Sequence, residues 1–322
     1  MNKFRVVLTD YRYESIQPFC DVYDKEADIE FIPMQLHTKA DILRETEYAD
    51  GVMCHFEQLD SDIIKNLKNC KVIARSAVGV DNIDLQAASE KRIPVANVPD
   101  YCVEEVSNHA MLLLLNCAKK MKQLERAAAN GSWDYSAAKP VGALRYKTLG
   151  LVGCGNIARC IVPKAKAFGL TVLGYDPYLP EEIFERCGIT QVKELDSLLA
   201  QSDFVNIQLH HTAETDKMVN EDFLARMKPT AYLINTARGG LVDEAALVEA
   251  LRRGVIAGAG LDVLSTESVP ADHPLLGLEN AVVTPHAAWY TEEAMYTLLT
   301  SAAAEVVRVL RGQPLKHQVN RF

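Results

Sequence analysis

Apolar and polar residues alternate along the first part of the chain in a pattern typical of strands and helices that follow one another. Up to about residue 98, short apolar runs are separated by stretches with helical spacing. The predicted strands are 4–8, 29–33, 51–54, 71–74 and 94–96, and the predicted helices lie near 39–46, 61–67 and 85–91. Because alternating strands and helices favour parallel pairing, this region is expected to form a sheet covered on both faces.

A second region of the same kind begins at residue 148. A long helical pattern at about 101–121 and a looser stretch precede it. Its predicted strands start at 148 and continue near 171–175, 204–208, 231–235, 258–263 and 281–284, and a last helix is predicted at about 292–310. Two alternating regions predict an α/β protein of two doubly wound, Rossmann-like domains.

Composition narrows the class of protein. Hydrophobic residues make up 48% of the 322 residues and charged residues 24%, as in ordinary globular proteins. The formal charge of -9 argues against nucleic acid as a partner, and no apolar stretch reaches the roughly 18 residues of a membrane helix. Eight cysteines without a Cys-x-x-Cys pair, and a start without a signal-peptide pattern, predict a cytoplasmic protein. His210 and His211 lack a third ligand at suitable spacing, so no metal site is predicted.

A glycine-rich turn predicts a nucleotide site. Gly153-Cys154-Gly155-Asn156-Ile157-Ala158 follows an apolar strand and opens a helical pattern, as in the G-x-G-x-x-G/A fingerprint. The glycines let backbone N–H groups approach a pyrophosphate at the helix N-terminus. Asp176 closes the next strand, where a carboxylate accepts the ribose 2′-hydroxyl and repels a 2′-phosphate, so NAD is predicted over NADP. Pro163 falls inside the predicted helix and is expected to kink it.

Three separated residues in the last third of the chain suggest a reaction. They are Arg238, Glu267 and His286. A guanidinium can bind a carboxylate in bidentate fashion and polarise an adjacent carbonyl. An imidazole can exchange a proton at that oxygen, and a nearby carboxylate favours its protonated form. The set suits chemistry on a 2-oxo or 2-hydroxy acid.

Five strings together resemble the D-isomer-specific 2-hydroxyacid dehydrogenase family, most of all its C-terminal-binding-protein branch. They are Ser-Ala-Val-Gly-Val-Asp-Asn-Ile-Asp at 76–84, Ala-Lys-Ala-Phe-Gly at 165–169, Gly-Tyr-Asp-Pro-Tyr-Leu at 174–179, Asn-Thr-Ala-Arg-Gly-Gly at 235–240 and Thr-Pro-His-Ala-Ala-Trp-Tyr at 284–290. The resemblance implies a coenzyme domain inserted into a discontinuous, flavodoxin-like substrate domain. Residues 1–98 plus 291–322 would form the substrate domain, and 99–290 the NAD-binding domain.

The resemblance also implies roles for individual residues. Arg238 would bind the substrate carboxylate and carbonyl, His286 would be the acid/base, and Glu267 would pair with His286. The further substrate-binding residues implied are Arg75, Val78 and Gly79, the last two through their backbone N–H groups, and Trp289. The cofactor-binding residues implied are Gly153, Gly155, Asn156, Ile157, Asp176, Thr236, Ala237, Asp262 and His286.

Two functions remain open from the sequence. One is an NAD-dependent dehydrogenase that interconverts a D-2-hydroxy acid and its 2-oxo acid. The alternative is an NAD(H)-gated protein-interaction module, as in C-terminal-binding-protein corepressors. The complete set of Arg238, Glu267 and His286 favours the enzyme, because a sensor has little need for all three. A homodimer through the region near 101–147 is also expected. The chain departs from the family at 209–215, which is shorter than usual, and at Val106, where a threonine is common.

Overall fold

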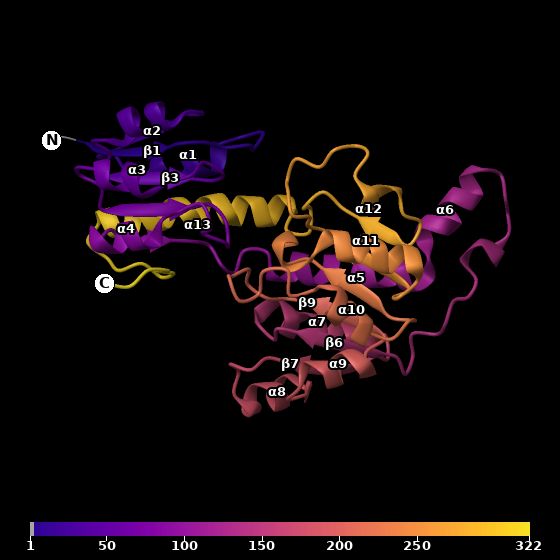
Figure 1. Cartoon of the computed structure of the whole chain (residues 1–322). Helices are drawn as coiled ribbons and strands as arrows, with labels where there is room; N and C mark the ends of the chain where they lie inside the picture. The colour runs from indigo at the N-terminus through magenta and orange to yellow at the C-terminus, as the bar shows by residue number, and fades with distance from the viewer. Residues whose placement is uncertain (1–2) are drawn as a thin grey trace. The chain divides into compact units, whose positions relative to one another are not determined.

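The computed structural model describes residues 3–322, and the chain divides into two compact units (Figure 1). The first unit contains the residues up to Cys102 together with Thr291–Phe322, and the second is Val103–Tyr290. The second unit is therefore inserted into the sequence of the first. The first segment extends beyond the predicted boundary at residue 98.

The first unit is built on a five-stranded parallel sheet in the flavodoxin-like order β2-β1-β3-β4-β5. Its strands are β1 (Phe4–Leu8), β2 (Ile29–Pro33), β3 (Gly51–Cys54), β4 (Val72–Arg75) and β5 (Val95–Ala96). β3 is buried at every position, as expected for a parallel strand covered on both faces. The sheet matches the parallel arrangement predicted from the sequence.

Helices cover both faces of this sheet. They are α1 (Gln17–Tyr23), α2 (Lys39–Thr46), α3 (Ser61–Asn66), α4 (Leu85–Glu90) and α13 (Glu292–Leu310). α13 buries Leu298, Leu299, Ala302 and Val306, spaced so that they share one helix face, in a core with β1, β3 and β4. Its N-terminus is capped by Thr291, whose hydroxyl accepts the N–H of Ala294. A second core on the other face contains residues of α2, α3 and α4.

The second unit is built on a seven-stranded parallel sheet in the order β12-β11-β10-β9-β6-β7-β8. Its strands are β6 (Thr148–Val152), β7 (Thr171–Tyr175), β8 (Thr190–Gln191), β9 (Phe204–Ile207), β10 (Tyr232–Asn235), β11 (Gly258–Leu261) and β12 (Ala281–Val283). The strand order reverses between β6 and β9, which is the switch point where doubly wound sheets bind ligands.

Two hydrophobic cores lie on the two faces of this sheet. One contains α5 (Val103–Lys119) and α7 (Asn156–Ala167), and the other contains α9 (Leu195–Gln201), α10 (Glu221–Arg226) and α11 (Glu244–Arg253). The remaining helices are α6 (Met121–Ala129), η1 (Tyr135–Ala138), α8 (Glu181–Cys187), η2 (Gly239–Leu241) and α12 (Pro274–Gly277). Among residues 3–322, no helix is long and apolar enough to cross a membrane.

The helix predicted at 101–121 differs from the structure. α5 ends at Lys119, and Lys120 adopts a left-handed conformation with φ 51° before α6 begins at Met121. α6 buries none of its residues, so the apolar pattern that marks α5 stops at this break. α7 continues past Pro163 to Ala167. α1 was not predicted from the sequence.

Candidate active site

The three candidate catalytic residues follow three neighbouring parallel strands of the second unit. Arg238 comes shortly after β10, Glu267 after β11 and His286 after β12. The coenzyme turn follows β6, and Asp176 follows β7. Because the carboxyl ends of parallel strands meet at one edge of the sheet, all five segments leave the sheet at the same edge.

His286 and Glu267 form a direct pair. Nδ1 of His286 lies 2.8 Å from Oε1 of Glu267. A carboxylate at this nitrogen favours the tautomer that carries a proton on Nδ1, and it stabilises the charge of an imidazolium. The pairing leaves Nε2 as the ring nitrogen that can exchange a proton with a substrate. In the sequence, Ser268 and Val269 separate Glu267 from Pro270.

The backbone of His286 is held in an uncommon conformation. Its φ is 52°, which few residues other than glycine, asparagine and aspartate adopt. Its N–H donates to the carbonyl oxygens of Asp262, at 2.8 Å, and Thr284, at 3.0 Å. These contacts fix the turn after β12, so the direction of the imidazole is set by main-chain bonds.

Asp262 organises the same turn through its side chain. The residue is 1% exposed, and its carboxylate accepts the N–H groups of Ala287 and Ala288, each at 2.9 Å, and the hydroxyl of Thr284 at 2.6 Å. His109 of α5 places Nε2 2.9 Å from the Thr284 hydroxyl oxygen and 3.4 Å from Oδ1 of Asp262. Asp262 was predicted to contact the nicotinamide, and that role stays a prediction. The structure adds that its carboxylate positions the segment that carries His286.

The loop that carries Arg238 is held by a buried amide. Asn235 donates from Nδ2 to the carbonyl oxygen of Arg238 at 2.9 Å and accepts the N–H of Ala237 on Oδ1 at 3.0 Å. The guanidinium of Arg238 donates from Nη1 to the carbonyl oxygen of Ala237 at 2.7 Å. Gly239 is required next to it, because a Cβ there would lie 1.9 Å from backbone atoms of Leu264. The loops after β10 and β11 thus pack backbone against backbone.

A further acid supports the segment before Glu267. Glu244, in the first turn of α11, accepts the N–H of Ser265 at 2.5 Å, and its other oxygen lies 3.2 Å from Nε2 of His273. These contacts anchor the loop on both sides of Glu267. The sequence shows Glu244 only as an ordinary acid in a first helical turn, where the helix dipole favours it.

The glycine turn has the geometry that a pyrophosphate needs. Gly153 has φ 86°, and a Cβ there would lie 2.4 Å from the carbonyl oxygen of Gln208. A Cβ on Gly155, at the N-terminus of α7, would meet no protein atom within 4 Å, so the space beside this glycine is open to a ligand. Asn156 and Ile157 form the first turn of α7, and Ala158 is buried. The N–H groups of this turn can therefore meet an anion.

Asp176 is tied directly to the glycine turn. One carboxylate oxygen accepts the N–H of Cys154 at 3.0 Å, and the other accepts the N–H of Tyr178 at 3.0 Å. Each oxygen keeps a lone pair for a ribose hydroxyl. Burial raises the pKa of the Cys154 thiol to about 12, so this cysteine is packing in the turn and not a thiolate. The residues present fit a dinucleotide whose adenosine ribose carries a free 2′-hydroxyl and no 2′-phosphate.

Two other predicted cofactor residues lie at the end of β10. The hydroxyl of Thr236 accepts a hydrogen bond from Nε2 of Gln208, which follows β9, at 2.7 Å. Thr236 therefore lies beside the end of β9, one of the two strands at the switch point of the sheet. Gln208 carried no signal in the sequence, because a single glutamine after a strand is common.

The predicted substrate residues belong to both units, and each is described in its own. Arg75 ends β4 of the first unit, donates from Nε to the carbonyl oxygen of His55 at 3.0 Å and lies 3.9 Å from Asp81. Among residues 3–322, the N–H groups of Val78 and Gly79 donate to no protein acceptor in the pattern of backbone hydrogen bonds. Trp289, in the second unit, packs edge-on against Tyr290.

Sequence reasoning missed residues that hold the site without forming a motif. Asn235 and Thr284 stand inside the strings that carry the family resemblance, so proximity to Arg238 and His286 was an available signal. His109 stands four residues after Glu105, a spacing that indicates only a shared helix face, and its ring lies against Thr284 and Asp262. A sequence separation of 175 residues hides this contact. His211 lies 2.8 Å from Asp216, and residues 3–322 contain no group of three or more metal-ligating side chains.

Comparisons with known proteins identify the family of this chain. The family model for the NAD-binding domain of D-isomer specific 2-hydroxyacid dehydrogenases matches residues 111–288. D-3-phosphoglycerate dehydrogenase of Methanocaldococcus jannaschii is 39% identical over 284 residues, which cover 88% of this chain and 54% of that protein. Glyoxylate reductase of Korarchaeum cryptofilum is 38% identical over 269 residues, which cover 82% of this chain and 80% of that protein.

The fold of the whole chain also matches that of a solved structure. The crystal structure of D-lactate dehydrogenase from Aquifex aeolicus, complexed with NAD and lactic acid, has a TM-score of 0.85 and 28% identity, and the match covers 95% of this chain and 96% of that one. The chain spans about half the length of the phosphoglycerate dehydrogenases it matches. The likeness to the C-terminal-binding-protein branch stays a prediction. The chain belongs to the D-isomer-specific 2-hydroxyacid dehydrogenase family, and its second unit contains the family's NAD-binding domain.

Proposed function

We propose that this protein interconverts a D-2-hydroxy acid and its 2-oxo acid with NAD as coenzyme. The observation that carries the proposal is the pair between Nδ1 of His286 and Glu267 at 2.8 Å, on the sheet edge that also holds Arg238 and the glycine turn. A binding module has no use for an imidazole whose second nitrogen is left for proton exchange. The relatives, which include phosphoglycerate dehydrogenase and glyoxylate reductase, support the same reaction class.

In the direction of reduction, Arg238 binds the substrate carboxylate and polarises the adjacent carbonyl. The N–H groups of Val78 and Gly79 provide further donors for the carboxylate. His286 donates its Nε2 proton to the carbonyl oxygen, and Glu267 stabilises the imidazolium before the transfer. When bound, NADH supplies the hydride that adds to C2. In oxidation, His286 accepts the hydroxyl proton on Nε2.

The substrate is proposed to be a 2-oxo acid with an apolar side chain of some size. Trp289, close in sequence to His286, is an aromatic side chain that the smallest acids do not need. NADH consumption with a panel of glyoxylate, hydroxypyruvate, 3-phosphohydroxypyruvate and branched 2-oxo acids tests the proposal. At saturating NADH, turnover is expected to be fastest with a branched 2-oxo acid. Absence of turnover with all of them, together with NADH-dependent capture of a protein partner, would favour the interaction module.

Asp176→Ala is expected to lower the preference for NADH over NADPH by at least tenfold. The carboxylate would repel the 2′-phosphate of NADPH, and a factor of ten corresponds to only about 1.4 kcal/mol. The ratio of kcat/KM for the two coenzymes measures the effect. Glu185→Ala, which removes an exposed acid of α8, is the matched control and should leave the ratio unchanged. An unaltered ratio in Asp176→Ala would remove this residue from coenzyme selection.

We propose that the chain forms a homodimer through the region near 101–147. In Figure 1, α6 and the segment after it extend from the rest of the second unit. Trp133 is 97% exposed and Tyr146 is 80% exposed, which is unusual for large apolar side chains. A second copy of the chain would cover them. Sedimentation equilibrium at micromolar concentration should give twice the chain mass, and a monomer there would contradict the proposal.

A further inference from the structure

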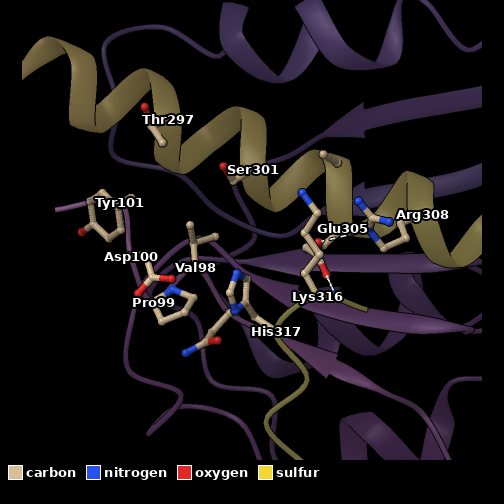
Figure 2. Close-up of a pocket in the computed structure, with 12 residues that line it drawn as sticks. Val98, Pro99, Asp100, Tyr101, Thr297, Ser301, Glu305, Arg308, Lys316 and His317 are labelled. Atoms are coloured by element: carbon tan, nitrogen blue, oxygen red, sulfur yellow. Dashed lines mark hydrogen bonds and ion pairs between the residues drawn. The ribbon is translucent and has the colours of Figure 1, made fainter. Parts of the chain in front are cut away.

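A cavity of about 200 Å³ lies within the first unit, and none of the candidate catalytic residues lines it (Figure 2). α13 forms one side of it, and the segment from Val98 to Tyr101 and the C-terminal segment at His317 form the other. The volume is that of about seven water molecules at roughly 30 Å³ each, so it suits a small metabolite and not a dinucleotide.

The lining of the cavity favours an anion. It contains two cations, Arg308 and Lys316, and the imidazole of His317, beside the acids Asp100 and Glu305. Glu305 is 4% exposed, and its two oxygens are already used, by Nε of Arg308 at 3.4 Å and by the backbone N–H of Lys316 at 2.8 Å. Arg308 therefore compensates the charge of Glu305, and its Nη1 also donates to Oε1 of Gln313 at 3.3 Å, which leaves Lys316 as the main cation for a ligand. The ammonium of Lys316 takes no part in these bonds and can bind a ligand.

Hydroxyl groups complete the polar lining. Thr297 and Ser301 stand one turn apart on α13, and both border the cavity. Each hydroxyl can donate to an oxyanion. The lining thus combines Lys316 of the C-terminal segment with Arg308 and two hydroxyl groups of α13, and each of these groups can donate to an oxyanion.

The cavity is joined by hydrogen bonds to the loop predicted to hold the substrate carboxylate. Asn97 donates from Nδ2 to the carbonyl oxygen of Val78 at 2.6 Å, and the N–H of Val98 donates to the carbonyl oxygen of Ala77 at 3.0 Å. Both donors belong to residues that line the cavity. The peptide planes that they fix present the N–H groups of Val78 and Gly79. Ordering of residues 97 and 98 therefore orders these two amides.

We propose that this cavity binds a small oxyanion, a carboxylate or a phosphate, and that its binding orders the loop at 76–80. The anion is held by Lys316, Arg308 and the hydroxyls of Thr297 and Ser301. Binding of the anion does not depend on the proposed function. Only the effect of the anion on substrate affinity rests on the proposed function. A ligand changes the affinity of another site only if it binds two states of the protein differently, and here the two states are the ordered and the less ordered loop at 76–80.

Titration calorimetry with orthophosphate and with succinate, in the full chain at constant ionic strength, tests the binding. Two variants remove the site in different ways: Lys316→Gln removes its exposed cation, and Ser301→Leu fills its volume while keeping a good helix former. Lys25→Gln is the matched control, because Lys25 is an exposed lysine of the same unit far along the chain from the cavity segments. The wild type and the control should bind at least one of the two anions, and each site variant should bind it at least tenfold more weakly.

Hydrogen exchange of the peptide that contains residues 76–80 tests the coupling without any turnover. Exchange is expected to slow with the bound anion in the wild type and in Lys25→Gln, and to stay unchanged in the two site variants. If a 2-oxo acid substrate is found, the anion should lower its KM about fivefold in the wild type relative to Lys316→Gln. An anion that competes at the catalytic residues would raise KM equally in both proteins.

Equal affinity for orthophosphate and succinate in the wild type and both site variants, or no affinity in any of them, would overturn the inference. Binding that leaves exchange at 76–80 unchanged would overturn it as well. Either result leaves the proposed dehydrogenase activity standing. Conversely, a chain without turnover but with anion-dependent protection at 76–80 retains this site and loses the proposed function.

Discussion

His286→Ala is expected to lower kcat for the best 2-oxo acid by about 10²–10⁴-fold, the usual contribution of a general acid. The variant loses the Nε2 proton that must reach the carbonyl oxygen. The Kd for NADH should change little, because the glycine turn and Asp176 are held by bonds that do not involve His286. Single-turnover rates and NADH fluorescence titration measure the two quantities.

The backbone at this position needs its own control. His286 has φ 52°, so alanine also places a strained residue in the turn. His286→Asn removes the acid while tolerating the left-handed conformation, and it should lose as much kcat as alanine. His210→Ala, which removes an exposed histidine of the same unit, should keep full activity. Wild-type turnover in His286→Asn would show that the proton comes from another group.

The hydrophobic pattern was enough to predict the sheets, and the motifs supplied the candidate residues of the site. The strands at 4–8, 29–33, 51–54 and 171–175 appear in the structure with the same bounds, because parallel strands covered on both faces give nearly continuous apolar runs. The position of the coenzyme turn followed from two glycines and one acid, since each meets a separate steric or electrostatic requirement.

The supports of the site could not be predicted in the same way. Asp262 binds two backbone N–H groups and the Thr284 hydroxyl, and Asn235 binds both ends of the Arg238 loop. Such bonds depend on the path of the loop after a strand, and the periodicity of apolar residues does not predict the path of a loop. The break between α5 and α6 could not be predicted either. Lys120 adopts the left-handed conformation there, and lysine is not a residue type that favours it.

The position of Glu267 depends on tertiary contacts as well as on the sequence motif. In the sequence, two residues, Ser268 and Val269, separate Glu267 from Pro270, and the motif alone does not fix where the carboxylate lies. The structure sets it by packing Gly239 against Leu264 and by anchoring Ser265 to Glu244. The carboxylate lies 2.8 Å from His286 with these residues after it, because the supporting contacts come from η2 and α11.

Arg238→Lys is expected to lower kcat/KM for the 2-oxo acid by about 10²–10⁴-fold, although the positive charge is retained. Each hydrogen bond between charged groups contributes about 1.5–3 kcal/mol, and lysine cannot reproduce the two parallel bonds of a guanidinium to a carboxylate. Steady-state kinetics with saturating NADH measure the change. Both KM and kcat should suffer, because the same group binds the carboxylate and polarises the carbonyl.

The control for Arg238→Lys is Arg252→Lys on α11, an exposed arginine whose exchange should leave kcat/KM unchanged. The backbone of residue 238 should not move in the variant, because Asn235 holds its carbonyl oxygen and not its side chain. A large loss is then attributable to the guanidinium. An Arg238→Lys enzyme with wild-type kcat/KM would show that the carboxylate is held elsewhere, and Arg75 would become the first residue to replace.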